Sequence, residues 1–271
     1  MCTGVDEVGQ LVRLRFAVRS PSVGHVGGPL HFDALAETYE RARPPYPEAL
    51  WDRMRELEVL RPGVRVIELG AGTGEATKRL LEAGAEVVAV EPGRALAARL
   101  QRRCPSAQIV GARAEDAALA EGQFDLAVAA TSAHWLDLGV VIPKLHRAIV
   151  RDGHLAVWRT AFGDPGTTTP FRDRVDATVA QRVNELARPG PGELDTEDWA
   201  RLLSSSGDFS VVHIDEFRWN INLDADQVHG LFRTFSNWTA DEAVAAADAA
   251  RDLGGMVTEH YVTPLIVLQR T

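Results

Sequence analysis

Cysteine is nearly absent from this sequence. Its 271 residues include only Cys2 and Cys104. Two cysteines cannot build a disulfide framework or a pair of CxxC metal-binding motifs, and such a composition is typical of proteins that fold in a reducing compartment. Histidine, cysteine and aspartate do not cluster at metal-ligand spacing either, so no metal site is predicted.

Long hydrophobic runs are also lacking. The apolar stretch at residues 11–18 is interrupted by Arg13 and Arg15, so it does not form the core of a signal peptide. No other run approaches the length needed to span a bilayer. These absences predict a cytoplasmic protein without a membrane partner.

Basic residues are too few to balance the acidic ones. The sequence has 29 lysine and arginine residues against 38 aspartate and glutamate residues, a formal net charge of -9. A negatively charged surface repels phosphate backbones, which disfavours nucleic acid as a partner. Hydrophobic residues still make up 45% of the chain, enough for the core of one large α/β domain. The oligomeric state is not indicated.

Short apolar strands alternate with helices in the first half of the chain. The predicted strands are 64–69, 86–90, 108–111, 124–130 and 154–158, and the predicted helices are 48–60, 75–83, 94–103 and 138–150. Repeated strand-helix units of this length predict a parallel, doubly wound sheet. After Trp158 the pattern changes: helices are predicted at 171–186, 196–204, 225–235 and 240–253, a strand within 210–223 and a last strand at 261–269.

The most informative stretch is a glycine-rich loop. A buried strand ending at Leu69 runs into Gly70, Gly72 and Gly74, and a helix follows. Glycines at these positions allow unusual backbone angles and close approach of a ligand. The next strand ends in Glu91, and an acid at that place suits the diol of a ribose. The pattern therefore predicts a nucleotide-containing ligand, either NAD or S-adenosylmethionine (SAM).

Charge distinguishes these two ligands. The dinucleotide pattern G-x-G-x-x-G would place its third glycine at position 75, where this chain has Glu75, and Glu68 precedes the loop. Carboxylates beside a pyrophosphate are repulsive, whereas the sulfonium and ammonium groups of SAM are attracted to them. The loop therefore favours SAM.

Several motifs in order resemble those of class I SAM-dependent methyltransferases. Glu68-Leu69-Gly70-Ala71-Gly72-Thr73-Gly74 resembles motif I of that family, and Val88-Ala89-Val90-Glu91-Pro92 resembles the motif on its second strand. Arg113-Ala114-Glu115-Asp116 is similar to the adenine-contacting segment, and Phe124-Asp125-Leu126-Ala127-Val128 to the fourth strand. Upstream, Phe32-Asp33, Tyr39, Arg41, Arg43-Pro44 and Tyr46-Pro47 look like the beginning of a bacterial small-molecule subgroup related to trans-aconitate methyltransferase.

The resemblance implies a cofactor site for S-adenosyl-L-methionine. Gly70 and Gly72 would approach the methionine end, and Glu68 would hold its amino group. Glu91 would accept hydrogen bonds from the ribose. Ala114 would offer its backbone N–H to adenine, with Glu115 near the exocyclic amine, although Arg113 replaces the acidic or amide residue frequent before it. The remaining predicted cofactor-binding residues are Tyr39, Arg43, Gly74, Pro92 and Thr131.

His134 is the candidate catalytic residue. It follows the fourth strand, where it would face the transferred methyl group and act as a base if the acceptor must lose a proton. The alternative is a hydrogen-bonded histidine that shapes the pocket. The acceptor pocket is expected to involve Arg159, Arg233, Trp238, His260 and Tyr261, each with a structural role as the alternative.

The chain is therefore predicted to be a SAM-dependent methyltransferase acting on a small organic acceptor. We predict an extension at 1–30, a SAM-binding Rossmann-like core at 31–160, and lid helices at 161–271 together with the last two strands of a seven-stranded sheet. The resemblance implies that the last strand is antiparallel. Two alternatives stay open: an NAD(P)-dependent oxidoreductase on a Rossmann fold, and a SAM-binding protein without catalysis.

Overall fold

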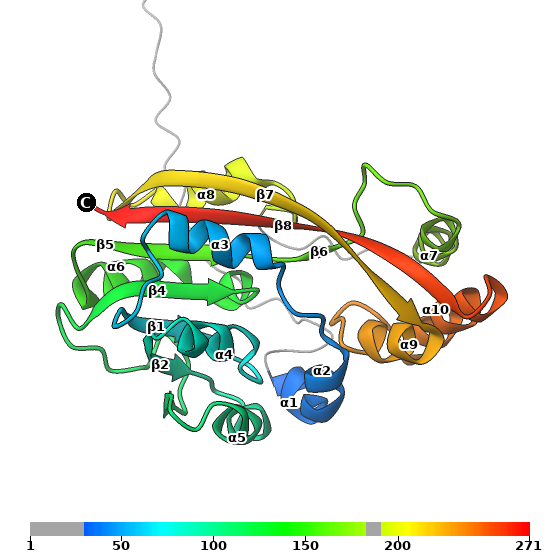
Figure 1. The fold of residues 1–271 in the computed structure, drawn as a ribbon, viewed down its shortest axis with the longest axis horizontal. Coiled ribbons are helices and arrows are strands. Elements are labelled where there is room, and N and C mark those ends of the chain that lie inside the picture. Colours follow the sequence, from blue (N-terminus) through cyan, green and yellow to red (C-terminus); the bar gives the residue numbers. More distant parts are fainter. Residues whose placement is uncertain (1–29, 183–190) are drawn as a thin grey trace, which may run out of the picture.

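A computed structural model of the chain describes residues 30–182 and 191–271 (Figure 1). The predicted N-terminal extension lies outside the described residues apart from Leu30. The end of the predicted helix 171–186 and most of the loop that follows it also lie outside them.

One mixed sheet of eight strands runs through the described part of the chain. Its strands are β1 (Arg65–Leu69), β2 (Glu86–Val90), β3 (Gln108–Val110), β4 (Phe124–Ala130), β5 (Ile149–Trp158), β6 (Ala161–Phe162), β7 (Phe209–Asp224) and β8 (Met256–Arg270). Strands β1 to β5 are parallel in the order β3-β2-β1-β4-β5, and β8 follows antiparallel to β5. The two-residue β6 continues beside β8 beyond β5, and β7 pairs with β8. The predicted seven-stranded Rossmann-like sheet is confirmed, with β6 as an addition.

Strand β5 begins earlier than the sequence pattern predicted. The expected strand started at His154 because Arg151 and Asp152 interrupt the apolar pattern. In the structure Asp152 has a φ of +65°, and the pairing register with β4 shifts between Phe124 and Leu126. A bulge of this kind lets the strand continue through polar residues.

Helices cover both faces of the sheet (Figure 1). On β1, Val66 packs with α3 (Glu48–Glu56), α4 (Glu75–Glu82) and α5 (Arg94–Arg103), while the next residue, Ile67, packs with α6 (Leu138–Ala148) and α8 (Thr196–Ser204). Successive side chains of a strand point to opposite faces, so a strand buried on both sides is apolar throughout. Both residues are fully buried.

A third apolar cluster lies where β7 and β8 extend beyond the other strands. It contains α7 (Pro170–Ala180), α9 (Ala225–Arg233) and α10 (Ala240–Asp252), and Figure 1 shows these helices together at that end of the molecule. Capping boxes begin two of them: Asp224 with Gln227 at α9, and Thr239 with Glu242 at α10. Each box satisfies backbone N–H groups that the first helical turn leaves without partners.

The N-terminal helices contact both the helices of the main sheet and the third apolar cluster. The Asp33 carboxylate, in α1 (Leu30–Ala34), accepts the N–H groups of Ala95 and Leu96 at 2.6 and 3.0 Å and so caps the start of α5. Helix α2 (Ala36–Ala42) packs against α9, where a Cβ at Gly230 would lie 3.3 Å from that of Ala42. No helix in residues 30–182 or 191–271 has both the length and the apolar character of a membrane span.

Candidate active site

A cavity of about 520 Å³ opens at the carboxyl ends of β1, β2 and β4. The strand order reverses between β1 and β4, and open parallel sheets bind ligands at such a point. Every predicted site residue except Gly74 lines the cavity: Tyr39, Arg43, Glu68, Gly70, Gly72, Glu91, Pro92, Ala114, Glu115, Thr131 and His134.

Two glycines of the loop have different reasons to be glycine. Gly70 has a φ of +69°, and a Cβ there would lie 2.7 Å from the Cβ of Ser132, whose hydroxyl donates to the Leu69 carbonyl at 2.6 Å. Gly72 has a φ of +59°, and its Cβ would meet only Tyr39, at 4.0 Å. Gly70 therefore allows the β1 and β4 loops to pack together, while Gly72 leaves the cavity open.

Gly74 faces the protein interior. It has a φ of +87° at the start of α4, and a Cβ there would lie 2.6 Å from a methyl of Leu100. The Cys104 thiol lies 3.8 Å from its carbonyl oxygen. Gly74 therefore serves the packing of α4 on α5, and nothing in the glycine pattern separates it from the two glycines before it.

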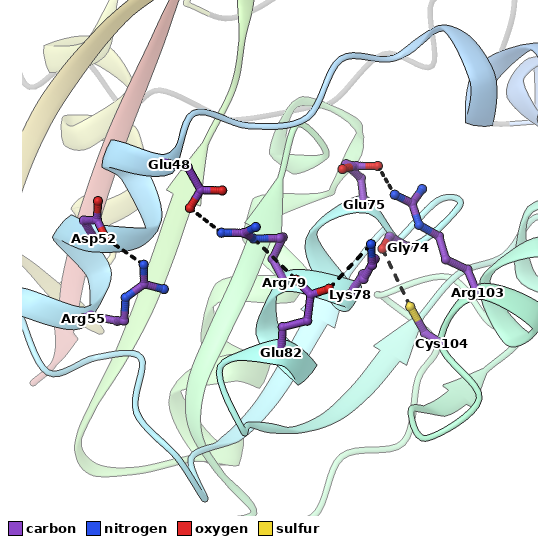
Figure 2. Close-up of polar contacts among 10 residues, drawn as sticks. All are labelled: Glu48, Asp52, Arg55, Gly74, Glu75, Lys78, Arg79, Glu82, Arg103 and Cys104. Carbon is purple, nitrogen blue, oxygen red and sulfur yellow. Dashed lines mark hydrogen bonds and ion pairs between the residues drawn. The ribbon is translucent and has the colours of Figure 1, made fainter.

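Glu75 does not contribute the negative charge that the loop sequence suggested. Its carboxylate pairs with Arg103 of α5 at 2.5 Å, next to the Gly74–Cys104 contact (Figure 2). Arg79 on the same helix pairs with Glu48 and Glu82 (Figure 2). The acidity of the cavity therefore comes from Glu68 and Glu91, which stand deeper in it.

Glu68 is a buried carboxyl at the end of β1. Its side chain is 1% exposed, and the Thr77 hydroxyl donates to Oε2 at 2.5 Å. No lysine or arginine of the described chain forms an ion pair with it. Burial, against the opposing effect of the Thr77 bond, raises the pKa of this carboxyl to about 8.

Glu91 holds the glycine loop. Its Oε2 accepts the N–H of Gly72 at 2.8 Å, and Oε1 accepts the N–H of Gly93 at 2.7 Å. Burial raises the pKa of the carboxyl despite these two bonds. Each carboxylate oxygen has a second lone pair, so both remain able to accept from a ligand.

Arg43 brings a positive charge to the other side of the cavity. Its Nη2 donates to the Thr234 carbonyl at 3.0 Å, and it has no ion pair within the described residues. The guanidinium lies 4.9 Å from the ring centres of Tyr39 and Phe162 and 5.1 Å from that of Phe235. Aromatic faces stabilise such a cation without neutralising it, so Arg43 retains its charge for a ligand.

Lys144 holds the segment that was expected to contact adenine. Lys144 donates to the carbonyl oxygens of Ala114 and Glu115 at 3.0 and 2.7 Å. The Ala114 N–H donates to no group of the described chain. Glu115 pairs with Arg113 at 3.2 Å and accepts the N–H of Asp137 at 2.9 Å. An N–H on the cavity wall therefore stands ready for an acceptor.

His134 lies in the short 3-10 helix η1 (Ala133–Trp135) directly after β4. Its ring centre is 5.0 Å from that of Trp135, which in turn meets Phe32 edge-on at 5.6 Å. The side chain lines the cavity, where it can reach a ligand. This geometry is compatible with both roles considered for His134.

The far wall of the cavity is aromatic, and the sequence pattern missed most of it. Its rings follow one another in the order Phe162, Phe235, Phe232 and Trp238, and the ring centres of neighbours in this series are 4.8, 5.2 and 4.5 Å apart. Of the expected acceptor residues, Trp238 and Arg159 line the cavity, whereas Arg233, His260 and Tyr261 do not. The missed residues Phe162, Phe232 and Phe235 come from β6, α9 and the turn after it.

The other two arginines on this side are already paired. Arg159 pairs with Glu193. Arg172 binds Glu259 through Nε at 3.0 Å and through Nη2, and Glu259 is fully buried. Neither arginine brings an uncompensated charge to the cavity. Within residues 30–182 and 191–271, no three His, Cys, Asp or Glu side chains are grouped in a way that could hold a metal ion.

Comparisons with known proteins agree with one another. Residues 67–157 match a family model described as a methyltransferase domain. An uncharacterised methyltransferase of Mycobacterium tuberculosis is 35% identical over 132 residues, which are 48% of this chain and 53% of the relative. A malonyl-[acyl-carrier protein] O-methyltransferase of Pseudescherichia vulneris is 31% identical over 99 residues, 36% of this chain and 39% of the relative. The alignment with the mycobacterial relative thus spans about half of its length.

A solved structure extends the likeness beyond the matched domain. The structure of a proposed type II methyltransferase from Anaeromyxobacter dehalogenans superposes with a TM-score of 0.58 at 26% identity, over 84% of this chain and 97% of the other. The two chains therefore share their fold over most of their length. The trans-aconitate subgroup is not singled out by these relatives, which correspond to the broader class.

Proposed function

We propose that this chain, which carries a class I SAM-dependent methyltransferase domain, transfers a methyl group from S-adenosyl-L-methionine to a small organic acceptor. The observation that carries the proposal is the charge pattern of the cavity. Two buried acids, Glu68 and Glu91, stand beside the glycine loop without ion-pair partners among the described residues, and Arg43 stands opposite them without one. A buried carboxyl without a partner is costly to ionise, and a cationic ligand removes that cost, so a ligand with a positive group beside the acids is expected.

These residues fit SAM group by group. Glu68 would receive the ammonium group, Arg43 the carboxylate and Glu91 the ribose hydroxyls. The Ala114 N–H would bond a ring nitrogen of adenine. A pyrophosphate would meet two acids at the loop instead, so the same charges disfavour NAD. When bound, SAM supplies a methyl carbon that leaves its sulfur, where the bonding electrons remain, for a lone pair of the acceptor.

The residues of this chain would position the two reactants and exclude water during this reaction. The Gly70 and Gly72 backbone and the two acids would fix the donor, and the aromatic wall would hold the acceptor in line and keep water out. Where the acceptor must lose a proton, an imidazole nitrogen of His134 would take it. For an acceptor that need not give its proton to the protein, His134 would only shape the pocket.

The acceptor side supports a compact molecule. Phe162, Phe232, Phe235 and Trp238 form a concave apolar surface, which suits a small organic molecule better than a polymer. Helices α7, α9 and α10 would form the lid over it, in keeping with a lid region at 161–271 on a core at 31–160. The net charge of -9 also disfavours RNA and DNA as acceptors.

Ligand binding and methyl transfer test the proposal in two steps. Titration calorimetry should give micromolar affinity for SAM and for its product S-adenosylhomocysteine, and far weaker affinity for NAD. A screen with labelled SAM against a metabolite extract, total RNA and a protein lysate should label small molecules only. Tight NAD binding without SAM binding would instead favour an oxidoreductase, and SAM binding with no labelled product would favour a non-catalytic SAM-binding protein.

A further inference from the structure

Arg172 lines the cavity beside the aromatic wall. It lies in the first turn of α7, where the hydroxyl of Thr169, the N-cap residue, accepts the Arg172 backbone N–H at 3.1 Å. Its neighbour Phe171 meets Phe232 of the wall edge-on, with ring centres 6.1 Å apart. The start of α7 therefore packs on the wall and places a guanidinium group next to it.

This guanidinium group is held in one orientation. Its Nε donates to Oε1 of Glu259 at 3.0 Å, and its Nη2 donates to Oε2 of the same carboxylate. Gly163, which follows Phe162 of the wall, passes so close that a Cβ there would lie 2.8 Å from Cζ and 2.9 Å from Nη1 of Arg172. Two parallel hydrogen bonds to one carboxylate fix the plane of a guanidinium group, so the direction of its third nitrogen is fixed too.

That third nitrogen, Nη1, remains for a ligand. It has no hydrogen-bond partner among the described residues, and it is not one of their fully buried unpaired atoms. The Arg172 side chain is 15% exposed, and the cavity lies next to it. A guanidinium N–H can donate a hydrogen bond but cannot accept one. The group that meets Nη1 must therefore carry a hydrogen-bond acceptor, such as an oxygen atom.

Charge decides which kind of oxygen fits. Glu259 is fully buried and both of its oxygens accept from Arg172, so the positive charge of Arg172 is compensated before any ligand arrives. A carboxylate at Nη1 would lose its hydration to meet a cation that is already paired, which is costly. An uncharged oxygen loses less hydration and still gains the hydrogen bond. An ammonium group could accept nothing from Nη1.

We propose that the methyl acceptor is a small, largely apolar molecule with an uncharged oxygen, such as the carbonyl of a ketone or an ester, which accepts a hydrogen bond from Nη1 of Arg172. The inference rests on the proposed function and narrows its class of acceptors. The aromatic wall buries the apolar part of the molecule, and Arg172 fixes its orientation. Arg172 is then a specificity-determining residue, because a guanidinium group stays protonated and exchanges no proton with the acceptor.

Three probes of similar shape test this class on the protein loaded with S-adenosylhomocysteine. Acetophenone carries a carbonyl group, α-methylstyrene carries a methylene group in its place, and benzoate carries a carboxylate. Titration followed by ligand-observed NMR gives the three dissociation constants. Arg172→Lys keeps the positive charge but removes Nη1, so it should weaken acetophenone binding about two- to tenfold relative to α-methylstyrene, the range of one hydrogen bond.

Arg65→Lys is the matched control. Arg65 binds the Asp125 carboxylate through Nε at 3.0 Å and through Nη2 at 2.8 Å, as Arg172 binds Glu259, but it does not line the cavity. The ratio of the acetophenone and α-methylstyrene affinities should therefore stay unchanged in Arg65→Lys. An unchanged ratio in a folded Arg172→Lys protein would overturn the contact with Nη1.

The charge argument has a test of its own. Glu259→Gln removes the negative charge that compensates Arg172, so benzoate should gain about tenfold or more in affinity relative to acetophenone, because a hydrogen bond between two charged groups is the stronger kind. In the unaltered protein, tighter binding of benzoate than of acetophenone would overturn the uncharged class. Should one of the two variants fail to fold, the other variant and the unaltered protein decide between the same outcomes.

Failure of the inference and failure of the proposed function are separable. A protein that binds S-adenosylhomocysteine but none of the three probes would overturn the aromatic wall and Arg172 as the place of the acceptor. A protein that does not bind S-adenosylhomocysteine at all would mean that the proposed function itself is wrong.

Discussion

Replacing Glu68 with glutamine tests the buried charge of the site most directly. Glutamine keeps the shape of the side chain and an oxygen that can accept the Thr77 hydroxyl, but it cannot ionise. In the unaltered protein, burial raises the pKa of Glu68 to about 8, whereas in the unfolded chain an exposed glutamate has the model value of 4.5. The two proteins should therefore differ in how their stability depends on pH.

The direction follows from proton binding. Between the two pKa values the folded protein holds a proton on Glu68 that the unfolded chain has released, so rising pH favours unfolding. Stability associated with this group is complete below about pH 4.5 and is lost as pH rises towards 8. The loss amounts to about 1.4 kcal/mol per pH unit within that window. Above pH 8 the carboxylate is charged in both states, and the difference between the proteins stops growing.

Urea unfolding of both proteins measures this effect. The free energy of unfolding is compared at steps of about half a pH unit, from about pH 5.5 to about pH 9. The Glu68→Gln protein should gain stability relative to the unaltered one as pH rises, and the gain should level off near pH 8. Titrating groups that do not interact with Glu68 act equally in both proteins and cancel in the difference. Parallel stability curves would refute the buried-acid reasoning.

Cofactor binding should lower the raised pKa of Glu68. A cationic ligand favours the ionised form of Glu68, so binding below pH 8 should release a proton from the unaltered protein but not from Glu68→Gln. Calorimetry in two buffers of different ionisation enthalpy detects that proton. At pH 8 the variant should bind SAM about 1.5–3 kcal/mol more weakly, the range of a hydrogen bond to a charged group. Identical proton release from both proteins would mean that Glu68 does not meet the cation.

Three further changes probe other parts of the site. Glu91→Ala should weaken SAM binding by about 1.5–3 kcal/mol. It should also lower the urea-unfolding free energy, because two loop N–H groups lose their acceptor. Glu91→Gln is the control, and unchanged calorimetric affinity would remove Glu91 from the ribose site. Gly70→Ala should be less stable than Gly63→Ala by about 1–3 kcal/mol of overpacking, since both glycines have positive φ but only Gly70 faces a close neighbour; equal unfolding temperatures would contradict this. His134→Gln should slow methyl transfer by about 10²–10⁴-fold at unchanged SAM affinity if His134 is the base, and a change of only a few fold in the labelled-SAM rate would leave it a pocket-shaping residue.

Glu91 illustrates where local reasoning stops. Its place at the end of the second strand predicts an acid that accepts hydrogen bonds from a ribose, and it indicates nothing of a role within the protein. The structure makes it 5% exposed and bonds it to two loop amides. The Gly72 N–H that meets Glu91 belongs to the loop after another strand, so the packing of the folded chain decides this contact.

The sequence by itself determined most of the sheet and brought together the residues of the proposed cofactor site. Glu68, Gly70, Gly72 and Glu91 lie in a strand, a glycine loop, a helix and a second strand that follow one another directly. These consecutive elements have a hydrophobic spacing that can be recognised in the sequence. Their neighbours in space are close neighbours in the chain, and a pattern read along the chain can detect them.

The aromatic wall proposed to hold the acceptor was decided only by the tertiary structure. Phe162 of β6 and Phe235 after α9 are separated by the whole of α7, α8 and β7, yet their ring centres lie 4.8 Å apart, and Arg43 reaches both from the N-terminal segment. Aromatic residues at such separations have no spacing that distinguishes a pocket wall from ordinary core. The pairing of Glu75 with Arg103 is hidden for the same reason, since the packing of α5 beside α4 selects the partner. The sequence shows the chemistry of each side chain and the hydrophobic spacing of each helix and strand. Which of many possible long-range partners a side chain meets is decided only when the chain folds.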